Sequence, residues 1–296
     1  MTFAAKTRHL DRQVDGFRIH YREAGAPSST AVVLLHGSPS SSFSFRDVLP
    51  ALGAHTYAVA PDLPGFGFSE APEMEDFTFE RLSHLVDALL EDLGVHRYVL
   101  YITDFSTPVG YHMATRHPER IQGLVVQNGN AHEEGLNEAW EPVRRFWAEP
   151  TEQNRAALPE WLNFEGTRAT YLSGLPDHLA ELHPRESWHL DWQHLSAPGY
   201  VDLHFRLFND YRNHVARFEE IARYHRTHQP PCLILWGRHD TFFHIGEVLA
   251  YEREMAAFEA HIFDAGHFLL ETHAEEAGEI LVTFVENVFE RAGRDG

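Results

Sequence analysis

Residues 101–110 read YITDFSTPVG, and this stretch decides the fold. The hydrophobic run from Arg97 to Thr103 predicts a buried β-strand, and residues Thr107 to Arg116 predict a helix. Asp104 lies at the sharp turn between them. Such a strand–turn–helix elbow presents its side chain at the end of a sheet, where the side chain can act as a nucleophile. A carboxylate at this position can attack an electrophilic sp³ carbon and form an ester.

Apolar runs that predict strands recur along the chain and alternate with helical stretches such as Phe79 to Leu93. The runs comprise residues 17–22, 31–35, 57–60, 124–126, 232–236 and 260–263. Strands that alternate with helices are typical of an α/β fold with a doubly wound, mostly parallel sheet. We therefore predict this fold class.

The alternation stops between residues 131 and 213, where no strand-like run occurs. Five of the six tryptophans lie there, at Trp140, Trp147, Trp161, Trp188 and Trp192. An insertion at this point would cover the strand ends at which α/β sheets bind ligands. The sequence thus predicts a core of residues 1–130 and 214–296 with a helical cap of residues 131–213. Most of the aromatic residues can fill the interior of this cap, and a few are expected to line a pocket.

Composition limits the partners. Acidic residues outnumber basic ones by 44 to 24, which gives a formal charge of −20 and argues against a nucleic-acid partner. No apolar run approaches the roughly 20 residues of a membrane span, and no signal-like segment opens the chain, so we expect a soluble cytoplasmic protein. The single cysteine, Cys232, cannot form an internal disulfide. Histidines such as His112, His117 and His132 share no ligand spacing, and no metal site is predicted.

Three further motifs follow predicted strands. Residues 36–39 read HGSP, and the backbone N–H after Gly37 is suited to stabilising an oxyanion. Residues 236–240 read WGRHD and place Asp240 in a loop, and residues 264–268 read DAGHF and place His267 in another. The order along the chain is nucleophile, acid and histidine.

Together these motifs resemble the α/β-hydrolase superfamily, and within it the branch of haloalkane dehalogenases and epoxide hydrolases, which use an aspartate where esterases use serine. The resemblance implies that Asp104 forms a covalent ester and that His267 takes a proton from the water that hydrolyses it. It also implies that Asp240 orients His267 and that backbone N–H groups at Ser38 and Phe105 stabilise the oxyanion or leaving group. No cofactor is implied.

Each assignment has an alternative. Asp104 could instead cap the following helix, because aspartate is favoured at that position. Ser106 could be the nucleophile of an esterase or lyase, or it could be the small residue that the elbow requires. Asp240 could simply cap its loop. The chain could also be a scaffold that binds a small molecule without catalysis.

The choice of electrophile depends on cap tyrosines. Many haloalkane dehalogenases bind halide with an indole and an amide at positions that here hold Phe105 and Ser38, which weakens that assignment. Residues 208–213 resemble the cap segment of epoxide hydrolases that carries a proton-donating tyrosine, here Tyr211, and Tyr171 is a second candidate. Tyr211 could alternatively only pack its helix. The leading prediction is hydrolysis of a small hydrophobic epoxide to a diol with water as co-substrate, with haloalkane hydrolysis as the alternative.

Overall fold

The computed structural model describes residues 5–70 and 77–294 and contains an eight-stranded sheet in the order β1-β2-β4-β3-β5-β6-β7-β8. β1, β2 and β4 pair antiparallel, and the remaining neighbours pair parallel. The predicted α/β fold with a mostly parallel sheet is confirmed. The strands are β1 (Arg8–Val14), β2 (Phe17–Ala24), β3 (Thr30–Leu34), β4 (Tyr57–Pro61), β5 (Arg97–Thr103), β6 (Ile121–Gln127), β7 (Cys232–Gly237) and β8 (Glu259–Phe263).

The sequence did not predict β1. Its side chains are mostly exposed, so it carries no apolar periodicity that would reveal a strand. The strand forms because the chain reverses at Asp15 and Gly16, which both have positive φ, and pairs with β2 from Val14 opposite Phe17 onward. Two residues of positive φ are typical of the tight turn of a hairpin.

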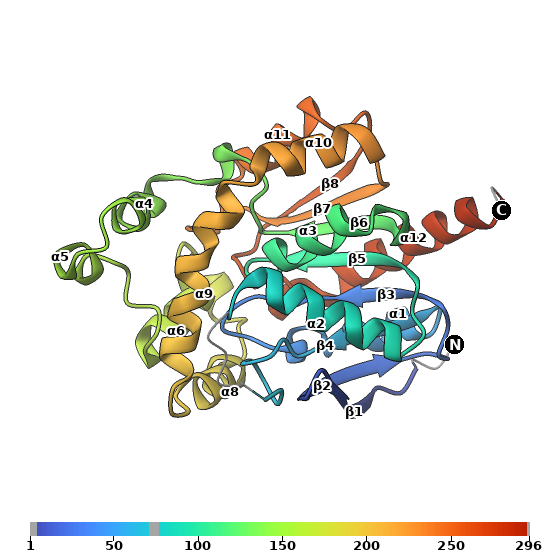
Figure 1. Cartoon of the computed structure of the whole chain (residues 1–296), viewed down its shortest axis with the longest axis horizontal. Helices are drawn as coiled ribbons and strands as arrows, with labels where there is room; N and C mark the ends of the chain where they lie inside the picture. The colour runs from blue at the N-terminus through green and yellow to red at the C-terminus, as the bar shows by residue number, and fades with distance from the viewer. Residues whose placement is uncertain (1–4, 71–76, 295–296) are drawn as a thin grey trace.

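Helices cover both faces of the sheet, and the residues of β5 alternate between them. Leu100 and Ile102 pack in one apolar cluster with α2, α3 and α10, whereas Val99 and Tyr101 pack in a second cluster with α1 and α12 (Figure 1). Burial on both faces explains why the strand reads as a continuous apolar run. The core helices are α1 (Leu49–Gly53), α2 (Phe79–Asp92), α3 (Ser106–Arg116), α10 (Phe218–His228), α11 (Gly246–Ala250) and α12 (Leu270–Arg294).

The insertion between β6 and α10 forms a helical cap to one side of the sheet (Figure 1). It contains α4 (Glu141–Ala148), α5 (Glu152–Ala156), α6 (Phe164–Leu172), α7 (Asp177–Ala180), α8 (Arg185–Leu195) and α9 (Tyr200–Val215). α9 continues past the predicted boundary at residue 213. In the part of the chain that the structure describes, no helix is both long and apolar enough to cross a membrane.

Polar contacts attach α9 to the core. Three of them involve backbone groups of the core: Asp210 Oδ2 accepts from the N–H of Phe79 at 2.9 Å, His204 Nε2 lies 3.0 Å from the carbonyl oxygen of Gly65, and His214 Nε2 lies 2.6 Å from that of Asn130. The cap and the core therefore share a tightly joined boundary along this helix.

Candidate active site

The elbow after β5 holds Asp104 in an unusual backbone conformation. Asp104 has a φ of 47°, in the left-handed region that costs a non-glycine residue roughly 1–2 kcal/mol. A Cβ atom at Gly37 would lie 2.5 Å from Asp104 Cβ, so only glycine fits opposite the turn. α3 begins at Ser106, and its N-cap residue Phe105 makes no side-chain cap bond. Asp104 is therefore not the N-cap of the helix, and that alternative is wrong.

Ser106 is part of the structure of the elbow. Its side chain is fully buried, and its Oγ accepts from the N–H of Thr103 at 2.9 Å. The same hydroxyl lies 2.7 Å from the carbonyl oxygen of Leu35 and 2.8 Å from that of Thr103. These contacts join the turn to β3 and β5. Ser106 thus has the packing role of a small elbow residue, and the serine-nucleophile alternative has no support in the structure.

The structure brings Asp104, His267 and Asp240 together from three separate loops. Asp104 Oδ1 accepts a hydrogen bond from the backbone N–H of Ser38 at 2.6 Å. Its other oxygen, Oδ2, lies 3.8 Å from His267 Nε2, which is beyond hydrogen-bonding distance. On the other side of the ring, His267 Nδ1 lies 2.6 Å from Asp240 Oδ2. The imidazole therefore has one fixed partner, Asp240, and one side that faces Asp104.

Asp240 has two functions at once. Its Oδ1 accepts from the N–H groups of Phe242 and Phe243 at 2.8 and 3.0 Å, so it does cap its own loop as the alternative predicted. Its Oδ2 meanwhile faces His267 and also accepts from Asn128 Nδ2 at 2.9 Å. The two interpretations of Asp240 are compatible because each oxygen has its own partners.

Asn128 is a site residue that the sequence analysis missed. It directly follows β6 and has a φ of 38°. Its side chain accepts from the N–H of Gly237 at 2.9 Å and donates to Asp240, while its carbonyl oxygen accepts from the N–H of Asp104. Asn128 therefore connects the turn that holds Asp104 to the loop that holds Asp240. A polar residue at the end of a central parallel strand was the available signal.

Burial and neighbouring charges shift the pKa values of Asp104 and His267. Burial raises the pKa of Asp104 above its usual value, and the charge of His267 and the backbone N–H groups of Ser38 and Phe105 offset only part of this effect. Burial alone would lower the pKa of His267, but the neighbouring carboxylates of Asp240 and Asp104 raise it above its usual value. The pKa of His267 therefore depends on whether Asp104 carries its charge.

A cavity of about 220 Å³ opens onto this group. Its wall includes Asp104, Asp240 and His267 from the core together with Ser38 and Phe105. The cap contributes mainly apolar and aromatic groups, among them Trp140, Trp161, Ala169 and Phe208. Two of the five cap tryptophans thus line the cavity. A cavity of this size and lining suits a small organic molecule.

The cap tyrosines are not among the residues that line this cavity. Tyr211 is fully buried with its ring against Phe105 and Trp140, at centroid distances of 6.1 and 5.0 Å. Its hydroxyl lies near the Asn130 side chain, and neither group makes a hydrogen bond of ordinary geometry within the described chain. Tyr211 therefore lies one layer behind the cavity wall.

Tyr171 lies at the boundary between cap and core. Its hydroxyl donates to Asp191 on α8, and its ring stacks on Phe268, the residue after His267, at a centroid distance of 4.0 Å. Tyr171 is not among the residues that line the cavity and its hydroxyl is bonded to Asp191, so the expectation that it donates a proton to the substrate finds no support in this placement.

Comparison with known proteins identifies the family. The family model described as the alpha/beta hydrolase fold matches residues 30–274, and the chain belongs to this family. An uncharacterised hydrolase of Saccharomyces cerevisiae is 36% identical over 284 residues, which cover 94% of this chain and 97% of that protein. A haloalkane dehalogenase of Bradyrhizobium diazoefficiens is 38% identical over 110 residues, covering 37% of this chain and 35% of the relative.

Among solved structures, the epoxide hydrolase CorEH superposes with a TM-score of 0.77 at 20% identity, covering 96% of this chain and all of that one. A haloalkane dehalogenase, DbeA of Bradyrhizobium elkani, superposes with a TM-score of 0.71 at 20% identity over 97% of this chain. These likenesses show the fold. The protein is a hydrolase of the α/β-hydrolase family.

Proposed function

We propose that the protein hydrolyses a small apolar epoxide to a diol through a covalent ester on Asp104. The observation that carries this proposal is the different surroundings of the two Asp104 oxygens. Oδ1 is held by the Ser38 N–H at 2.6 Å, whereas Oδ2 lies 3.8 Å from His267 Nε2 in a group that lines the cavity. One oxygen is positioned to become the ester carbonyl, and the other is available to attack carbon.

In the first step Asp104 Oδ2 attacks an epoxide carbon, and the bond between that carbon and the ring oxygen breaks. The ring oxygen keeps the electron pair and takes a proton, which leaves a hydroxyl group on the ester. Because Asp104 loses its charge in this step, the proposed nucleophile must be ionised beforehand. The raised pKa of Asp104 also makes its carboxylate a stronger nucleophile than an exposed one.

In the second step His267 Nε2 removes a proton from water, and the oxygen of that water attacks the ester carbon of Asp104. The negative charge then develops on Oδ1, where the N–H of Ser38 already donates. Donors of this kind stabilise the tetrahedral intermediate by several kcal/mol. Collapse of the intermediate releases the diol, whose oxygen takes the proton from His267. The second proton of the water leaves the Asp104 carboxyl and returns to the group that protonated the ring oxygen in the first step, which restores both the carboxylate and the donor. Asp240 holds the imidazolium in place throughout.

The residues that line the site suit an epoxide better than a haloalkane. The oxygen of the opened epoxide stays attached to the substrate and needs only a proton. Phe105 and Ser38 supply no aromatic N–H or side-chain amide beside Asp104. Tyr211 is the proposed proton donor, a role that requires its hydroxyl to reach the substrate from behind Phe105 and Trp140, which line the cavity. Burial keeps its pKa well above the usual value, so the hydroxyl is protonated, and the charge of Asp104 acts on it. This role rests on the resemblance of residues 208–213 to epoxide hydrolases.

Hydrolysis of a haloalkane is the second candidate. One observation favours it: Trp161 of the cap lines the cavity, and an indole N–H can donate to a leaving halide. The local identity to haloalkane dehalogenases points the same way. In either case the substrate is a small organic molecule and water is the second reactant.

A trapping experiment tests the shared mechanism. His267→Gln removes the base for ester hydrolysis, so incubation with panels of epoxides and haloalkanes should leave a stable adduct on the peptide that contains Asp104, detected by mass spectrometry. The double variant with Asp104→Ala should give none. Absence of an adduct from both panels, with unimpaired turnover by Asp104→Ala, would sink the ester mechanism.

The choice of electrophile has its own test, in which Tyr211→Phe is compared with Tyr171→Phe. Both are buried tyrosines of the cap, but the Tyr171 hydroxyl is bonded to Asp191 away from the cavity. Tyr211→Phe should slow adduct formation from epoxides by roughly 10²-fold or more and leave haloalkanes unaffected. Equal effects on both substrates, or equal effects of both variants, would remove the preference for epoxides.

A further inference from the structure

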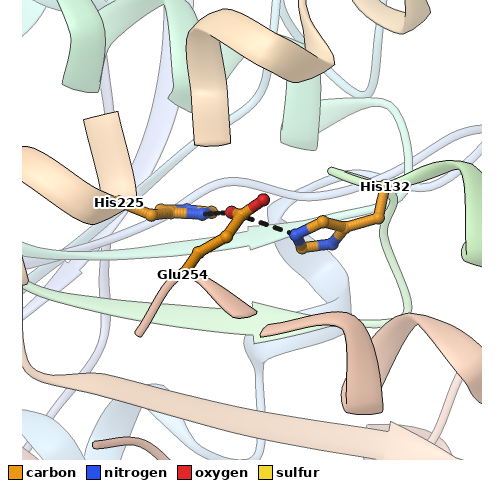
Figure 2. A group of neighbouring side chains, drawn as sticks. All are labelled: His132, His225 and Glu254. Atoms are coloured by element: carbon orange, nitrogen blue, oxygen red, sulfur yellow. Dashed lines mark hydrogen bonds and ion pairs between the residues drawn. The ribbon is translucent and has the colours of Figure 1, made fainter. Parts of the chain in front are cut away.

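A second group of ionisable side chains lies in the interior, apart from the residues that line the cavity. His132 follows β6 at the start of the insertion, His225 lies on α10, and Glu254 follows the short helix η5 (Tyr251–Arg253). All three are buried, and one ligand atom of each lies within 4.8 Å of the others. Figure 2 shows the Glu254 carboxylate between the two imidazole rings. Three elements that are distant in sequence thus direct metal-binding atoms at one point.

The spacing of these atoms is close to that of a metal coordination sphere. His225 Nδ1 lies 2.8 Å from Glu254 Oε2, and His132 Nε2 lies 3.1 Å from the same oxygen (Figure 2). Ligands at the usual ~2.0–2.1 Å from a tetrahedral zinc ion are about 3.3 Å apart. The two nitrogen–oxygen separations are therefore shorter than this value by a few tenths of an ångström, and the two nitrogens, which lie at most 4.8 Å apart, would have to approach each other by up to about 1.5 Å to bind one ion.

Outer partners present the correct nitrogen of each ring. His132 Nδ1 lies 2.7 Å from Glu247 Oε1, and His225 Nε2 lies 3.1 Å from the hydroxyl of Tyr111. When these outer nitrogens carry the protons, the inner nitrogens have free lone pairs that face the common point. A carboxylate behind a ligating histidine is the usual support of a metal site.

His132 supplies a second, independent sign of a ligand. Its side chain is only 4% exposed, and its Nε2 faces Glu254 Oε2 at 3.1 Å without the geometry of an ordinary hydrogen bond. A nitrogen lone pair that faces a buried carboxylate oxygen is unfavourable unless a cation, either a proton on the ring or a metal ion, lies between them.

Charge also favours a cation here. Glu247 and Glu254 are two carboxylates whose hydrogen-bond partners are imidazoles and backbone N–H groups. A divalent ion bound by two neutral imidazoles would balance both carboxylates. A proton on His132 is the simpler alternative, but it would balance only one of them.

We propose that His132, His225 and Glu254 bind a divalent transition-metal ion, best zinc, as a structural site, with Glu247 as the supporting carboxylate and water in the remaining position. Two imidazoles and one carboxylate are a ligand set that zinc accepts readily. Glu247 also accepts from the N–H groups of Ala131 and His132, so the ion would fix the chain where it leaves β6 for the cap. The site is independent of the proposed activity.

Metal binding by the full chain tests this proposal without an activity assay. After removal of metal with a chelator, the wild-type protein should bind about one equivalent of Co²⁺ and develop the intense visible absorption of a tetrahedral site. Zn²⁺ should displace the cobalt and raise the melting temperature. A stripped protein that gains neither the cobalt absorption nor any thermal stability from Zn²⁺ would overturn the proposal.

Variants locate the ion. His132→Gln, His225→Gln and Glu254→Gln should each weaken cobalt binding by at least ~10²-fold, and Glu247→Gln should weaken it by about 10–100-fold. His55→Gln is the matched control, because His55 Nδ1 also lies 2.7 Å from a glutamate oxygen, that of Glu286, but on the surface. Unchanged binding by the three ligand variants would equally overturn the proposal. If a histidine variant does not fold, Glu254→Gln, which keeps the size of the side chain, decides the location.

Discussion

Two groups in this molecule place an imidazole between two carboxylates, and they differ in spacing and access. In the candidate active site, His267 is 2.6 Å from Asp240 but 3.8 Å from Asp104, and all three residues line the cavity. In the interior group, His132 is 2.7 Å from Glu247 and 3.1 Å from Glu254, and it is buried. The same side-chain types therefore have two uses. A wide contact that faces a cavity leaves room for substrate and water, whereas two close contacts suit a proton or a metal ion.

The largest expected effect is a loss of activity that changes in the candidate active site should cause. Asp104→Ala removes the proposed nucleophile and should lower turnover by roughly 10⁴-fold or more, measured as diol formation. Asp202→Asn, an exposed change in the cap, is the control and should retain wild-type turnover. Turnover by Asp104→Ala within tenfold of wild type would place the chemistry on another residue.

The next effect separates the two groups by stability. His132→Gln leaves Glu247 buried without its imidazole partner and Glu254 with His225 alone, and it should lower the free energy of unfolding by about 3–5 kcal/mol. His267→Gln should cost less, about 1 kcal/mol, because its carboxylates line a cavity that water can enter. Urea denaturation in the presence of a chelator measures both. Equal losses would show that access to the cavity does not distinguish the two groups.

Variants of Asn128 test how the separation of 3.8 Å between His267 and Asp104 is maintained. Asn128→Gly and Asn128→Ala both remove the donor to Asp240 and should lower turnover about tenfold. Ala should also destabilise the fold by roughly 1 kcal/mol, since glycine tolerates the positive φ and alanine does not. If the amide positions Asp240, both variants also shift the pH dependence of ester hydrolysis. An unshifted profile would reduce Asn128 to a structural role.

The smallest effect is a pH dependence of opposite sign in the two groups. His267 acts as a base only when neutral, and its pKa is raised above 6.5, so ester hydrolysis should increase with pH along a limb above 6.5. That limb should lie lower than the pKa of the free enzyme, because the ester removes the charge of Asp104. Single-turnover hydrolysis of the ester that the wild-type protein forms after rapid mixing with substrate, followed at several pH values, measures it. A limb at or below pH 6 would contradict the assignment.

For the interior group, burial alone would lower the pKa of His132, but Glu247 and Glu254 raise it to about 9. The other ionisable groups around His132 are His225, Tyr251 and Glu134. A histidine whose folded pKa exceeds its unfolded value stabilises the protein fully below pH 6.5, and this contribution is lost as the pH rises through about 9. The stability of the metal-free protein should thus fall by at most about 1.4 kcal/mol per pH unit between these values. A rise in urea midpoint over this range would contradict the prediction.

The elements that the sequence predicted well are those set by local patterns. The β5 strand, the elbow and the loops with Asp240 and His267 follow from apolar runs and short motifs, and the structure brings the three side chains together. Tyr171 and Tyr211 were harder to place, because the rotation of α6 and α9 about their axes depends on packing within the cap. The ligand set of His132, His225 and Glu254 could not be predicted, since it depends on how α10 and the η5 segment cross the end of β6.

Asn128 lies between these cases. The residues after β6 were noted only because they lack the carboxylate that some relatives carry there. The structure shows that the Asn128 amide instead donates a hydrogen bond to the carboxylate of Asp240. The loops that follow β6 and β7 therefore meet at Asn128. A polar residue at a strand end was visible in the sequence, but its partner depended on the register of β6 against β7.

The attachment of α9 has a consequence for substrate exchange. With Asp210, His204 and His214 each bonded to the core backbone, α9 cannot tilt away from the sheet without breaking three polar contacts. Entry and product release would then depend on movement of other parts of the cavity wall, such as Pro159, Glu160 and Trp161 in the segment between α5 and α6. The cap would then not swing open as a unit, because α9 stays fixed to the core. The width of the entrance beside α9 would limit which substrates reach Asp104.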